Sequence, residues 1–468
     1  MTRATFRNWA GQYACTPQRV HRPRSADEVA AVLADARARG RRVRVIGAAH
    51  SPSDIAMSDD ELIALDLPPV CERVDDTRVR VSGDMPLRDL HPRLAALGLA
   101  MPNLGSISDQ TVAGAIATAT HGTGLRHGVL GTIVESAQVV APTGVIAATG
   151  DMLHAARCSL GCLGVHTSLV LNVVPAFDLD IHERPARLDD VLDRLDESLA
   201  ADHYRFWWVP HTDTALEWTA TRVPPDAALR RAPRASLAWW WRERFNGFHR
   251  FQCKLWLAAL GLASLPRVNQ WFARTMFNAE RRVRVPSIAG FNFDCLFRQH
   301  VDEWAIPREH CADALRRLRA AVDAEGLHAH LPVEVRFAAA DDIWLSPCHG
   351  RESCYIGVIA YRPYGREPGD RAHRRWFDAF ERIMLDLDGR PHWAKRFGPT
   401  AADLALRYPR WHDFQRVRAQ LDPDGTLANS YTDRVLGPVA SPSRDRKSLS
   451  GNCDSGASRG RKSPESGS

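Results

Sequence analysis

The stretch Arg42-Val43-Arg44-Val45-Ile46-Gly47-Ala48-Ala49-His50-Ser51 decides how this chain folds. Residues 42–46 alternate polar and apolar side chains with the period of two that is typical of a β-strand. Before this strand, Ser25 is placed to cap a helix, Glu28 follows three residues later, and Gly40 is a stop signal. The sequence therefore predicts a helix and then a strand that delivers three small residues and a histidine.

A second run of small residues lies at 111–124, TVAGAIATATHGTG. Apart from Ile116 and His121 it carries no long or charged side chain, so a bulky partner is expected to lie against it. A contact between two helices would also select small residues, but the final His-Gly-Thr-Gly would break a helix and offers backbone N–H groups instead. The two loops together suit a dinucleotide bound in extended form, since backbone N–H groups can hold a pyrophosphate.

The common nucleotide and metal signatures are absent from the sequence. There is no G-x-x-x-x-G-K-[ST], and residues 122–128 have one residue too many for G-x-G-x-x-G. Neither H-E-x-x-H nor a pair of C-x-x-C motifs occurs. His328 and His330 would share one face of a strand, but without a third ligand we interpret them as structural. We therefore expect neither a Rossmann nor a P-loop site, and no metal.

Composition and charge describe an ordinary globular protein. Its 468 residues are 45% hydrophobic and 25% charged, which leaves room for two or three domains. Of the net charge of +6, six Lys/Arg minus three Asp/Glu place +3 in residues 444–468. That tail is rich in Ser, Gly and charge and is expected to be disordered. The rest is only mildly cationic, so no nucleic-acid partner is expected.

The ten cysteines and the apolar runs bear on the location of the protein. The cysteines show no compact spacing, and the N-terminus has no signal-peptide core, which favours reduced thiols and a cytoplasmic protein. The longest apolar run, residues 255–265, is too short to cross a bilayer. Several tryptophans lie in or near it among arginines, at Trp239, Trp240, Trp241, Trp256 and Trp271. A packed helical insertion is the simpler interpretation, and peripheral contact with a membrane surface is the alternative.

The order of the motifs along the chain resembles a known family. His50-Ser51-Pro52-Ser53-Asp54, Pro332-Val333-Glu334-Val335-Arg336-Phe337, Gly389-Arg390-Pro391-His392-Trp393-Ala394-Lys395 and Leu421-Asp422-Pro423 are similar to segments of the aldonolactone oxidoreductases. These are the L-gulono-1,4-lactone and D-arabinono-1,4-lactone oxidases within the vanillyl-alcohol-oxidase (PCMH-type FAD) superfamily. The resemblance extends to about Leu436 and leaves the tail outside.

The resemblance implies the fold and the domain division. It implies an α+β fold, in which a two-subdomain PCMH-type FAD-binding domain is followed by an α+β substrate (cap) domain with an antiparallel sheet. Strand-like runs at 133–142 and 160–174 close the first domain near Pro175. We therefore expect an FAD-binding domain at 1–176, a substrate domain at 177–438 and a disordered tail at 439–468.

The same resemblance implies FAD as the cofactor, bonded through its 8α-methyl group to His50. The alternative is a histidine that only hydrogen-bonds the cofactor. The residues expected to contact FAD are Val45, Ile46, Gly47, Ala48, Ala49, His50, Ser51, Ser53, Asp109, Thr111, Gly114, Ala115, Thr118, Thr120, His121, Gly122, Thr123, Gly164 and Val165.

Three charged residues are the candidates for catalysis. Glu334 and Arg336 share one face of an otherwise apolar strand, and opposite charges are costly to bury there unless they are paired and used. From the residues alone a structural ion pair is an equal alternative. The resemblance implies that the pair lines the site in front of the flavin. Lys395 would stabilise negative charge on the substrate or the reduced flavin, unless it is a surface lysine.

The implied reaction is oxidation of a sugar lactone at C2, with loss of the hydroxyl proton. Two acceptors stay open, O₂ and a redox acceptor such as a cytochrome. Ala48, Ala49, Ala113, Ala117 and Ala119 stand where animal oxidases tend to have glycine, and the extra methyl groups would narrow the approach of O₂. We lean to O₂. An alditol oxidase, or a flavin-binding protein that has lost catalysis, are the other hypotheses.

Overall fold

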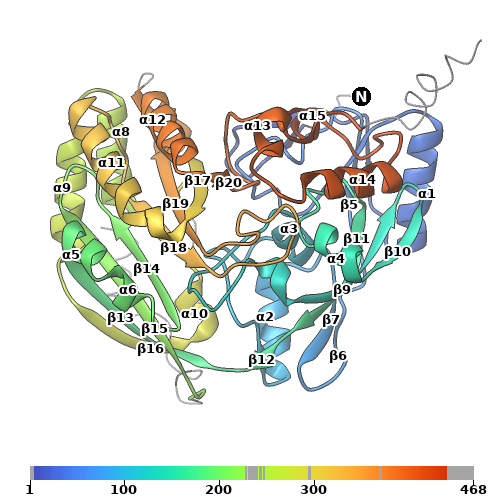
Figure 1. Ribbon diagram of the computed structural model, residues 1–468, viewed down its shortest axis with the longest axis horizontal. Helices are drawn as coiled ribbons and strands as arrows, with labels where there is room; N and C mark the ends of the chain where they lie inside the picture. Colours follow the sequence, from blue (N-terminus) through green and yellow to red (C-terminus); the bar gives the residue numbers. More distant parts are fainter. Residues whose placement is uncertain are drawn as a thin grey trace, which may run out of the picture.

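The computed structural model shows two sheet-based domains side by side (Figure 1). The antiparallel sheet and the mixture of helices and strands confirm the α+β prediction. The expected tail falls, apart from residue 439, outside the part of the chain that the structure describes, as do Trp239 and Trp240. The structure describes residues 5–226, 229, 241, 245, 248–293, 297–367 and 372–439.

The first domain begins with a small parallel sheet. Its strands run in the order β3, β5, β4, and helix α1 precedes β4. The side chain of Ser25 accepts from the Glu28 N–H at the start of α1, as predicted, and the predicted strand is confirmed as β4. The bounds are β1 (Phe6–Arg7), β2 (Ala14–Cys15), β3 (Arg19–His21), α1 (Ala26–Ala38), β4 (Val43–Ile46) and β5 (Glu61–Ala64).

An antiparallel five-stranded sheet completes the first domain, in the order β10-β9-β11-β7-β6. Helix α3, at the start of the second small-residue run, packs with α2 and this sheet in one apolar core. The bounds are β6 (Cys71–Arg73), β7 (Arg78–Ser82), α2 (Leu87–Ala96), β8 (Leu99–Ala100), α3 (Val112–Ala117), η1 (Leu130–Ile133), β9 (Val134–Ala141), β10 (Gly144–Ala148), α4 (Gly150–Ala156), β11 (Val165–Asn172) and β12 (Val174–Pro175).

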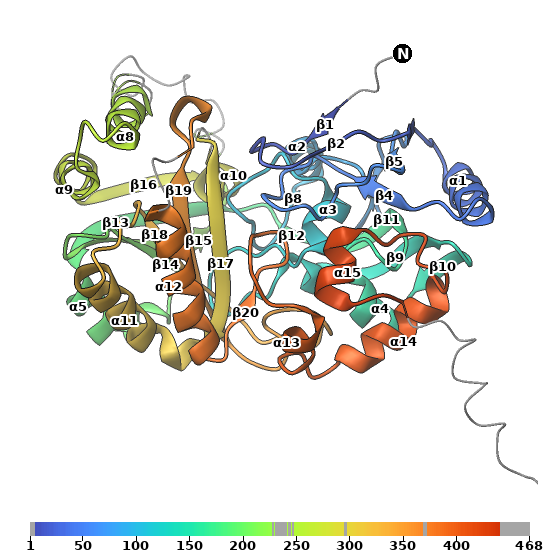
Figure 2. The same cartoon turned by 90° about the horizontal axis from the view of Figure 1, so that it is seen from above.

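The second domain is built on an eight-stranded antiparallel sheet in the order β16-β13-β15-β14-β18-β19-β17-β20. Helices α5, α11 and α12 cover the face turned away from the first domain (Figure 2). The bounds are β13 (Asp178–Arg187), α5 (Leu188–Asp193), α6 (Leu195–Ser198), β14 (His203–Trp208), β15 (Thr214–Val223), β16 (Arg281–Pro286), α10 (Ser287–Phe291), β17 (Gln299–Pro307), η4 (Arg308–His310), α11 (Cys311–Ala324), β18 (Val333–Ala338), β19 (Ser353–Tyr361), η5 (Pro363–Gly365), α12 (Ala372–Asp386) and β20 (Arg390–Pro391).

The tryptophan-rich segment between β15 and β16 contains helices α8 (Phe251–Ala259) and α9 (Leu265–Met276). They pack together at one end of the large sheet, where Phe251, Leu255 and Leu265 are buried with Tyr361. Among the residues that the structure covers, no helix is both long and apolar enough to cross a bilayer.

The last helices return to the first domain, above which they lie in Figure 1. The Thr426 carbonyl accepts from the Val43 N–H at 2.7 Å, and Leu427 is buried in the core around α1. The Asn429 side-chain amide donates to the Met57 carbonyl at 2.9 Å. Residues 426–429 therefore hold β4 and the loop that follows it in place. These helices are α13 (Ala401–Ala405), α14 (Trp411–Leu421) and α15 (Ser430–Leu436).

Acid is expected to destabilise the fold through buried histidines such as His91 on α2. His91 is 3% exposed, its Nε2 has no hydrogen-bond partner, and burial lowers its pKa from 6.5 to about 4. Because the folded pKa is depressed, this contribution to stability is complete above pH 6.5 and is lost as the pH falls towards 4. At pH 5 the loss amounts to about 2 kcal/mol.

The variant His91→Leu is expected to lose less stability than the parent protein between pH 7.5 and pH 5, by about 2 kcal/mol. Urea unfolding at the two pH values measures this difference. His412→Leu, at an exposed position of α14, is the control and should keep the parent's pH dependence. An equal loss in the His91 variant and the parent would contradict the prediction.

Candidate active site

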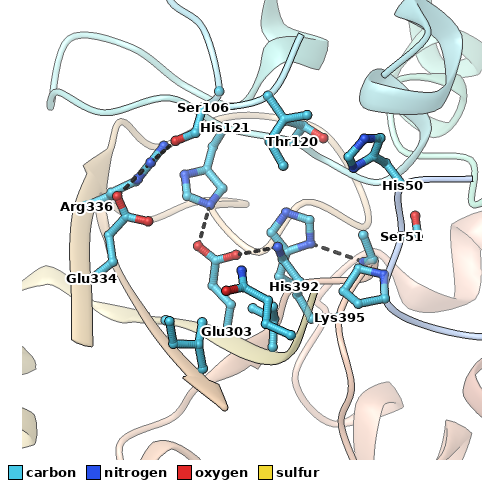
Figure 3. A pocket seen from close by; sticks show the side chains of 18 of the residues that line it. His50, Ser51, Ser106, Thr120, His121, Glu303, Glu334, Arg336, His392 and Lys395 are labelled. Carbon is cyan, nitrogen blue, oxygen red and sulfur yellow. Dashed lines mark hydrogen bonds and ion pairs between the residues drawn. The ribbon is translucent and has the colours of Figure 1, made fainter. Parts of the chain in front are cut away.

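A cavity of about 310 Å³ lies between the loops of the first domain and one end of the large sheet (Figure 3). All three catalytic candidates from the sequence, Glu334, Arg336 and Lys395, line it together with His50. Its remaining walls come from both domains and from the loop after β20. They are Ser51, Pro52, Gly105, Ser106, Ile107, Gln110, Thr120, His121, Trp207, Phe293, Phe297, Gln299, Val301, Glu303, Pro332, Gly357, Ile359, Tyr361, His392 and Ala394.

Glu334 on β18 presents one carboxylate oxygen to the protein and the other to the cavity. The Arg336 guanidinium donates to Glu334 Oε1 at 2.7 Å, and the Trp207 indole N–H donates to the same oxygen at 3.1 Å. Arg205 Nη1 lies 3.9 Å from it. Because these contacts all fall on Oε1, Oε2 is left to accept a hydrogen bond from a ligand in the cavity.

The strand register explains why two arginines flank this carboxylate. Arg205 on β14 pairs directly with Arg336 on β18, and like charges placed opposite each other are destabilising. Glu334 offsets this repulsion, and Arg205 is also sandwiched between the Trp207 and Trp218 rings, 4.6 and 4.4 Å from their centroids. Burial and then the Arg336 charge lower the pKa of Arg205 to about 9, so it is still cationic at neutral pH.

Arg336 also donates a hydrogen bond to the first domain. Its guanidinium donates to the hydroxyl of Ser106 as well as to Glu334, so it bridges the two domains (Figure 3). Its Nε is buried without a hydrogen-bond partner. An unpaired buried N–H is costly, and this one lies beside the cavity, where a bound acceptor would satisfy it.

A second charged cluster faces this pair across the cavity. Glu303 on β17 places Oε1 3.2 Å from His121 Nε2 and Oε2 3.6 Å from Lys395 Nζ. Burial raises the pKa of the Glu303 carboxyl, but the Lys395 ammonium and the contact with His121 lower it more, so it lies well below its usual value. Burial lowers the pKa of the adjacent His392 to about 3, and its Nδ1 accepts from the Ala394 N–H at 3.1 Å. Lys395 therefore lies inside the site.

His50 joins this cavity to two further hollows in the first domain. Its ring stacks on Trp9 with centroids 5.0 Å apart, and its Nε2 lies 3.5 Å from Asp109 Oδ2. Burial lowers the pKa of His50, although Asp109 opposes the shift. Its Nδ1 is buried and has no partner. A neutral imidazole with an unpaired nitrogen is suited to bond or accept from a ligand.

The second cavity, of about 100 Å³, is lined by the two small-residue loops. Arg44 of β4 lines this cavity. Its guanidinium donates to the carbonyls of Leu160, Gly161, Ile55 and Leu427 at 2.7 to 3.2 Å. Four carbonyls from three separate segments thereby converge on one buried cation. These hydrogen bonds from Arg44 hold the loop that carries His50 in place.

The FAD-contact residues expected from sequence divide among these spaces. Ser53, Ala115, Gly122, Thr123, Gly164 and Val165 line none of the three, and Thr123 instead bonds the Tyr204 carbonyl of the large sheet. The main cavity contains His50, Ser51, Thr120 and His121, the second contains Val45, Gly47, Ala48, Ala49, His50, Ser51, Thr111, Gly114 and Thr118, and the third contains Ile46, Gly47, Ala48, His50, Asp109 and Thr111.

These features fit an extended dinucleotide with a flat ring at one end. The cavities form a connected path through His50, and small residues line its narrow part. The first N–H groups of α3, at Val112, Ala113 and Gly114, already donate to Met85, Gly83 and Thr111, so this helix contributes small side chains to the path. Unpaired atoms of His50 and Arg336 lie at the wider end, where the ring system of FAD would sit.

The comparisons with known proteins define the class first. An FAD-binding domain family matches residues 17–150. A solvent-stable cholesterol oxidase superposes with a TM-score of 0.75 at 17% identity, covering 93% of this chain and 97% of the other. The cholesterol oxidase from B. sterolicum gives a TM-score of 0.69 at 14% identity, with 93% and 96% covered. The chain thus has the fold of a PCMH-type FAD-binding protein.

The sequence relatives define the family within this class. The D-arabinono-1,4-lactone oxidase family matches residues 169–435. L-gulonolactone oxidase of Mus musculus is 39% identical over 92% of this chain and 98% of its own length. L-gulono-1,4-lactone dehydrogenase of Mycobacterium tuberculosis (strain ATCC 25618 / H37Rv) is 39% identical over 92% and 99%. The chain belongs to the D-arabinono-1,4-lactone oxidase family.

Sequence reasoning missed several polar side chains of the cavity. Glu303 and Arg205 lie on strands whose pairing partners are remote in sequence, so no local pattern marks them. His392 lies inside the motif at 389–395 and Ser106 outside every motif named above, and neither was assigned a role. The strand order β14-β18-β19-β17 places Arg205 next to Glu334 and Glu303 in the cavity wall, while Ser106 and His392 reach the cavity from loops outside these strands.

Arg44→Met is expected to lower the free energy of unfolding by at least about 3 kcal/mol, because four buried carbonyls lose a charged donor. Urea unfolding followed by tryptophan fluorescence measures the change. Arg80→Met, at an exposed arginine of β7, is the matched control and should shift stability by less than about 0.5 kcal/mol. A loss below about 1 kcal/mol at Arg44 would contradict this account of the loop.

Proposed function

We propose that the protein uses FAD to oxidise an aldono-1,4-lactone, such as L-gulono- or D-arabinono-1,4-lactone, at the C2 hydroxyl. The observation that carries this proposal is the Glu334–Arg336 ion pair, which faces Lys395 across one cavity beside His50. A polar, charged cavity suits a hydroxyl-rich lactone. The names of the relatives in the same family point to this substrate class.

Each charged group has a separate role in this proposal. Glu334 Oε2 accepts a hydrogen bond from a substrate hydroxyl, because Oε1 already accepts from Arg336 and Trp207. Lys395 stabilises the negative charge that forms as the hydroxyl proton leaves. With FAD bound, Arg336 would offer its unpaired Nε as a donor to the ring, which becomes negative on reduction. Bound FAD supplies the hydride acceptor.

We further propose that His50 is covalently bonded to FAD. Its Nδ1 is unpaired while Nε2 faces Asp109, so Nδ1 is the nitrogen free to form the bond. A covalent bond removes the dissociation equilibrium of the cofactor. A hydrogen bond from the same nitrogen is the alternative.

The acceptor in this proposal is O₂, and a redox protein is the alternative. The relatives carry both names, oxidase and dehydrogenase. Ala49 and Ala119, two of the positions where animal oxidases tend to have glycine, adopt positive φ of 53° and 54°. The Ala49 methyl group borders the second cavity, so access of O₂ to the ring would depend on it, whereas the Ala119 methyl group is buried in the main core.

We also propose a cytoplasmic location with peripheral membrane contact. Cys15, Cys71, Cys158, Cys162, Cys253, Cys311, Cys348 and Cys354 are free thiols, which suits a reducing compartment. The helical insertion exposes Leu262, at 72%, between α8 and α9, and Arg267 is exposed in the first turn of α9. An exposed apolar side chain close to a cation suits anionic lipid. Co-sedimentation with phosphatidylserine vesicles is the measurement that checks the contact.

Protein purified after expression with riboflavin is expected to be yellow, and its peptide that contains His50 should carry the mass of FAD. Addition of L-gulono-1,4-lactone without oxygen should bleach the flavin, and addition in air should release hydrogen peroxide. His50→Ala should yield no flavin-linked peptide. Peptide mass spectrometry, absorbance and a peroxide assay give the three readouts.

Each negative result has its own meaning. Colourless protein that takes up no added flavin would refute the cofactor. Bleaching by xylitol but by no lactone would favour an alditol oxidase, and dye reduction without peroxide would favour a dehydrogenase. Bound flavin that no sugar or lactone bleaches would point to a protein that has lost catalysis.

Glu334→Gln is expected to lower kcat/KM for the lactone about 100-fold or more, because a charged hydrogen bond worth about 3 kcal/mol is lost and Arg336 loses its counter-ion. Steady-state kinetics at matched flavin content measure it. Glu183→Gln, on β13 of the same sheet and outside the cavity, is the control. A change of less than about threefold in kcat/KM of the Glu334 variant would contradict a contact between Glu334 and the substrate.

A further inference from the structure

Glu303 connects three parts of the chain across one wall of the cavity. His121 comes from the first domain, Glu303 from β17 of the large sheet, and Lys395 from the loop after β20 (Figure 3). One carboxylate oxygen faces His121 Nε2 at 3.2 Å and the other faces Lys395 Nζ at 3.6 Å. Glu303 is therefore shared by two partners, one on each oxygen.

Two acceptors lie against the His121 ring. Its Nδ1 lies 3.0 Å from the Gly122 carbonyl oxygen, which can only accept. Its Nε2 forms an ion-pair contact with Glu303 Oε1, which also only accepts. A neutral imidazole has a single N–H and offers a proton to only one of them. Since His121 is only 4% exposed, bulk water does not compensate for the missing donor.

We propose that Glu303 keeps His121 doubly protonated and thereby holds two fixed cations, His121 and Lys395, on one wall of the cavity. The cluster then sums to +1, from one carboxylate, one ammonium and one imidazolium. Its catalytic consequence rests on the proposed function: Glu303 is a positioning residue that aims two positive groups at the place where the substrate becomes negative.

The neighbours of His121 agree with this assignment. The Tyr355 ring stacks on it, with centroids 3.5 Å apart, and burial raises the pKa of that phenol, so it stays neutral. His392, whose ring centroid is 5.6 Å away, is neutral because burial lowers its pKa to about 3. Asp302 precedes Glu303 and contacts Trp304 and Arg396 instead. Glu303 is thus the counter-ion of His121.

A bound metal ion is the competing interpretation of the same side chains. His121, Glu303 and His392 are close enough together to ligate one. Lys395 opposes this, because its ammonium already faces Glu303, and His392 Nδ1 already accepts from a backbone N–H. A second proton on His121 therefore accounts for the cluster without a metal ion.

The decisive variant is Glu303→Gln, which keeps the shape of the side chain. The glutamine carbonyl can accept from Lys395, and its amide can donate to His121 Nε2 while Nδ1 still donates to Gly122. The ring then needs only one proton, so the fold is expected to persist while the imidazolium is lost. The unfolding midpoint should stay within a few degrees of the parent value.

Nitrogen NMR of the flavin-loaded protein, labelled with ¹⁵N-histidine, reads the ring state directly. His121→Asn identifies the His121 signals by their disappearance. In the parent protein both ring nitrogens should carry protons at pH 7.5, and in Glu303→Gln only Nδ1 should. A neutral His121 ring in the parent, or a doubly protonated ring in the variant, would overturn the proposal.

Kinetics give the second readout. In Glu303→Gln the rate of flavin bleaching by lactone is expected to fall at least tenfold, with KM changed less than threefold. Glu280→Gln, which removes the carboxylate of another His–Glu pair, 2.7 Å from the half-buried His182 and outside the cavity, is the matched control and should bleach at the parent rate. A parent-like rate in the Glu303 variant would overturn the catalytic part. If no lactone bleaches the flavin of the parent protein, the proposed function fails. The NMR result tests the state of the His121 ring independently of that outcome.

Discussion

Charge buried at the seam between two domains is the constraint on which the rest of the structure depends. Glu334, Arg336, Glu303 and Lys395 all lie in the cavity wall, where an unpaired charge would cost several kcal/mol. Glu334 is neutralised by Arg336 on the same strand, and Glu303 by Lys395 and by His121 of the first domain, so the domains cannot move apart without breaking the His121–Glu303 contact. The geometry that stabilises the seam is therefore also the geometry that presents charge to a ligand.

The backbone at this seam is as closely fitted as the side chains. The Gly124 N–H donates to the Phe337 carbonyl at 2.8 Å, directly after the E-x-R strand segment. A β-carbon at Gly124 would lie 2.5 Å from the Asp202 carbonyl oxygen, and φ is +116°, so only glycine fits. The His-Gly-Thr-Gly end of the second small-residue loop thus joins the domains, while its alanine-rich start faces the second cavity.

Local patterns in the sequence were enough for the elements that carry His50 and for the pairing of Glu334 with Arg336. Both depend on residues within a few positions of one another, such as the Ser25 cap and the alternation across Val335. Glu303 and Arg205 could not be found that way, because their places depend on which strands pair. The return of Leu427 and Asn429 to the first domain also depends on contacts with residues more than 350 positions away.

The left-handed backbone at Ala49 and Ala119 shows where the protein accepts strain near its cofactor site. A non-glycine residue costs about 1 to 2 kcal/mol in this conformation, which glycine would adopt freely. At Ala119 the methyl group is buried in the main core, so packing offsets part of that cost. At Ala49 it lies in the second cavity, where packing is loose. The strained loop is instead held at this point by the hydrogen bond from the Trp9 N–H to the Ala49 carbonyl, 2.8 Å long, and by the stacking of Trp9 on His50 one residue further on.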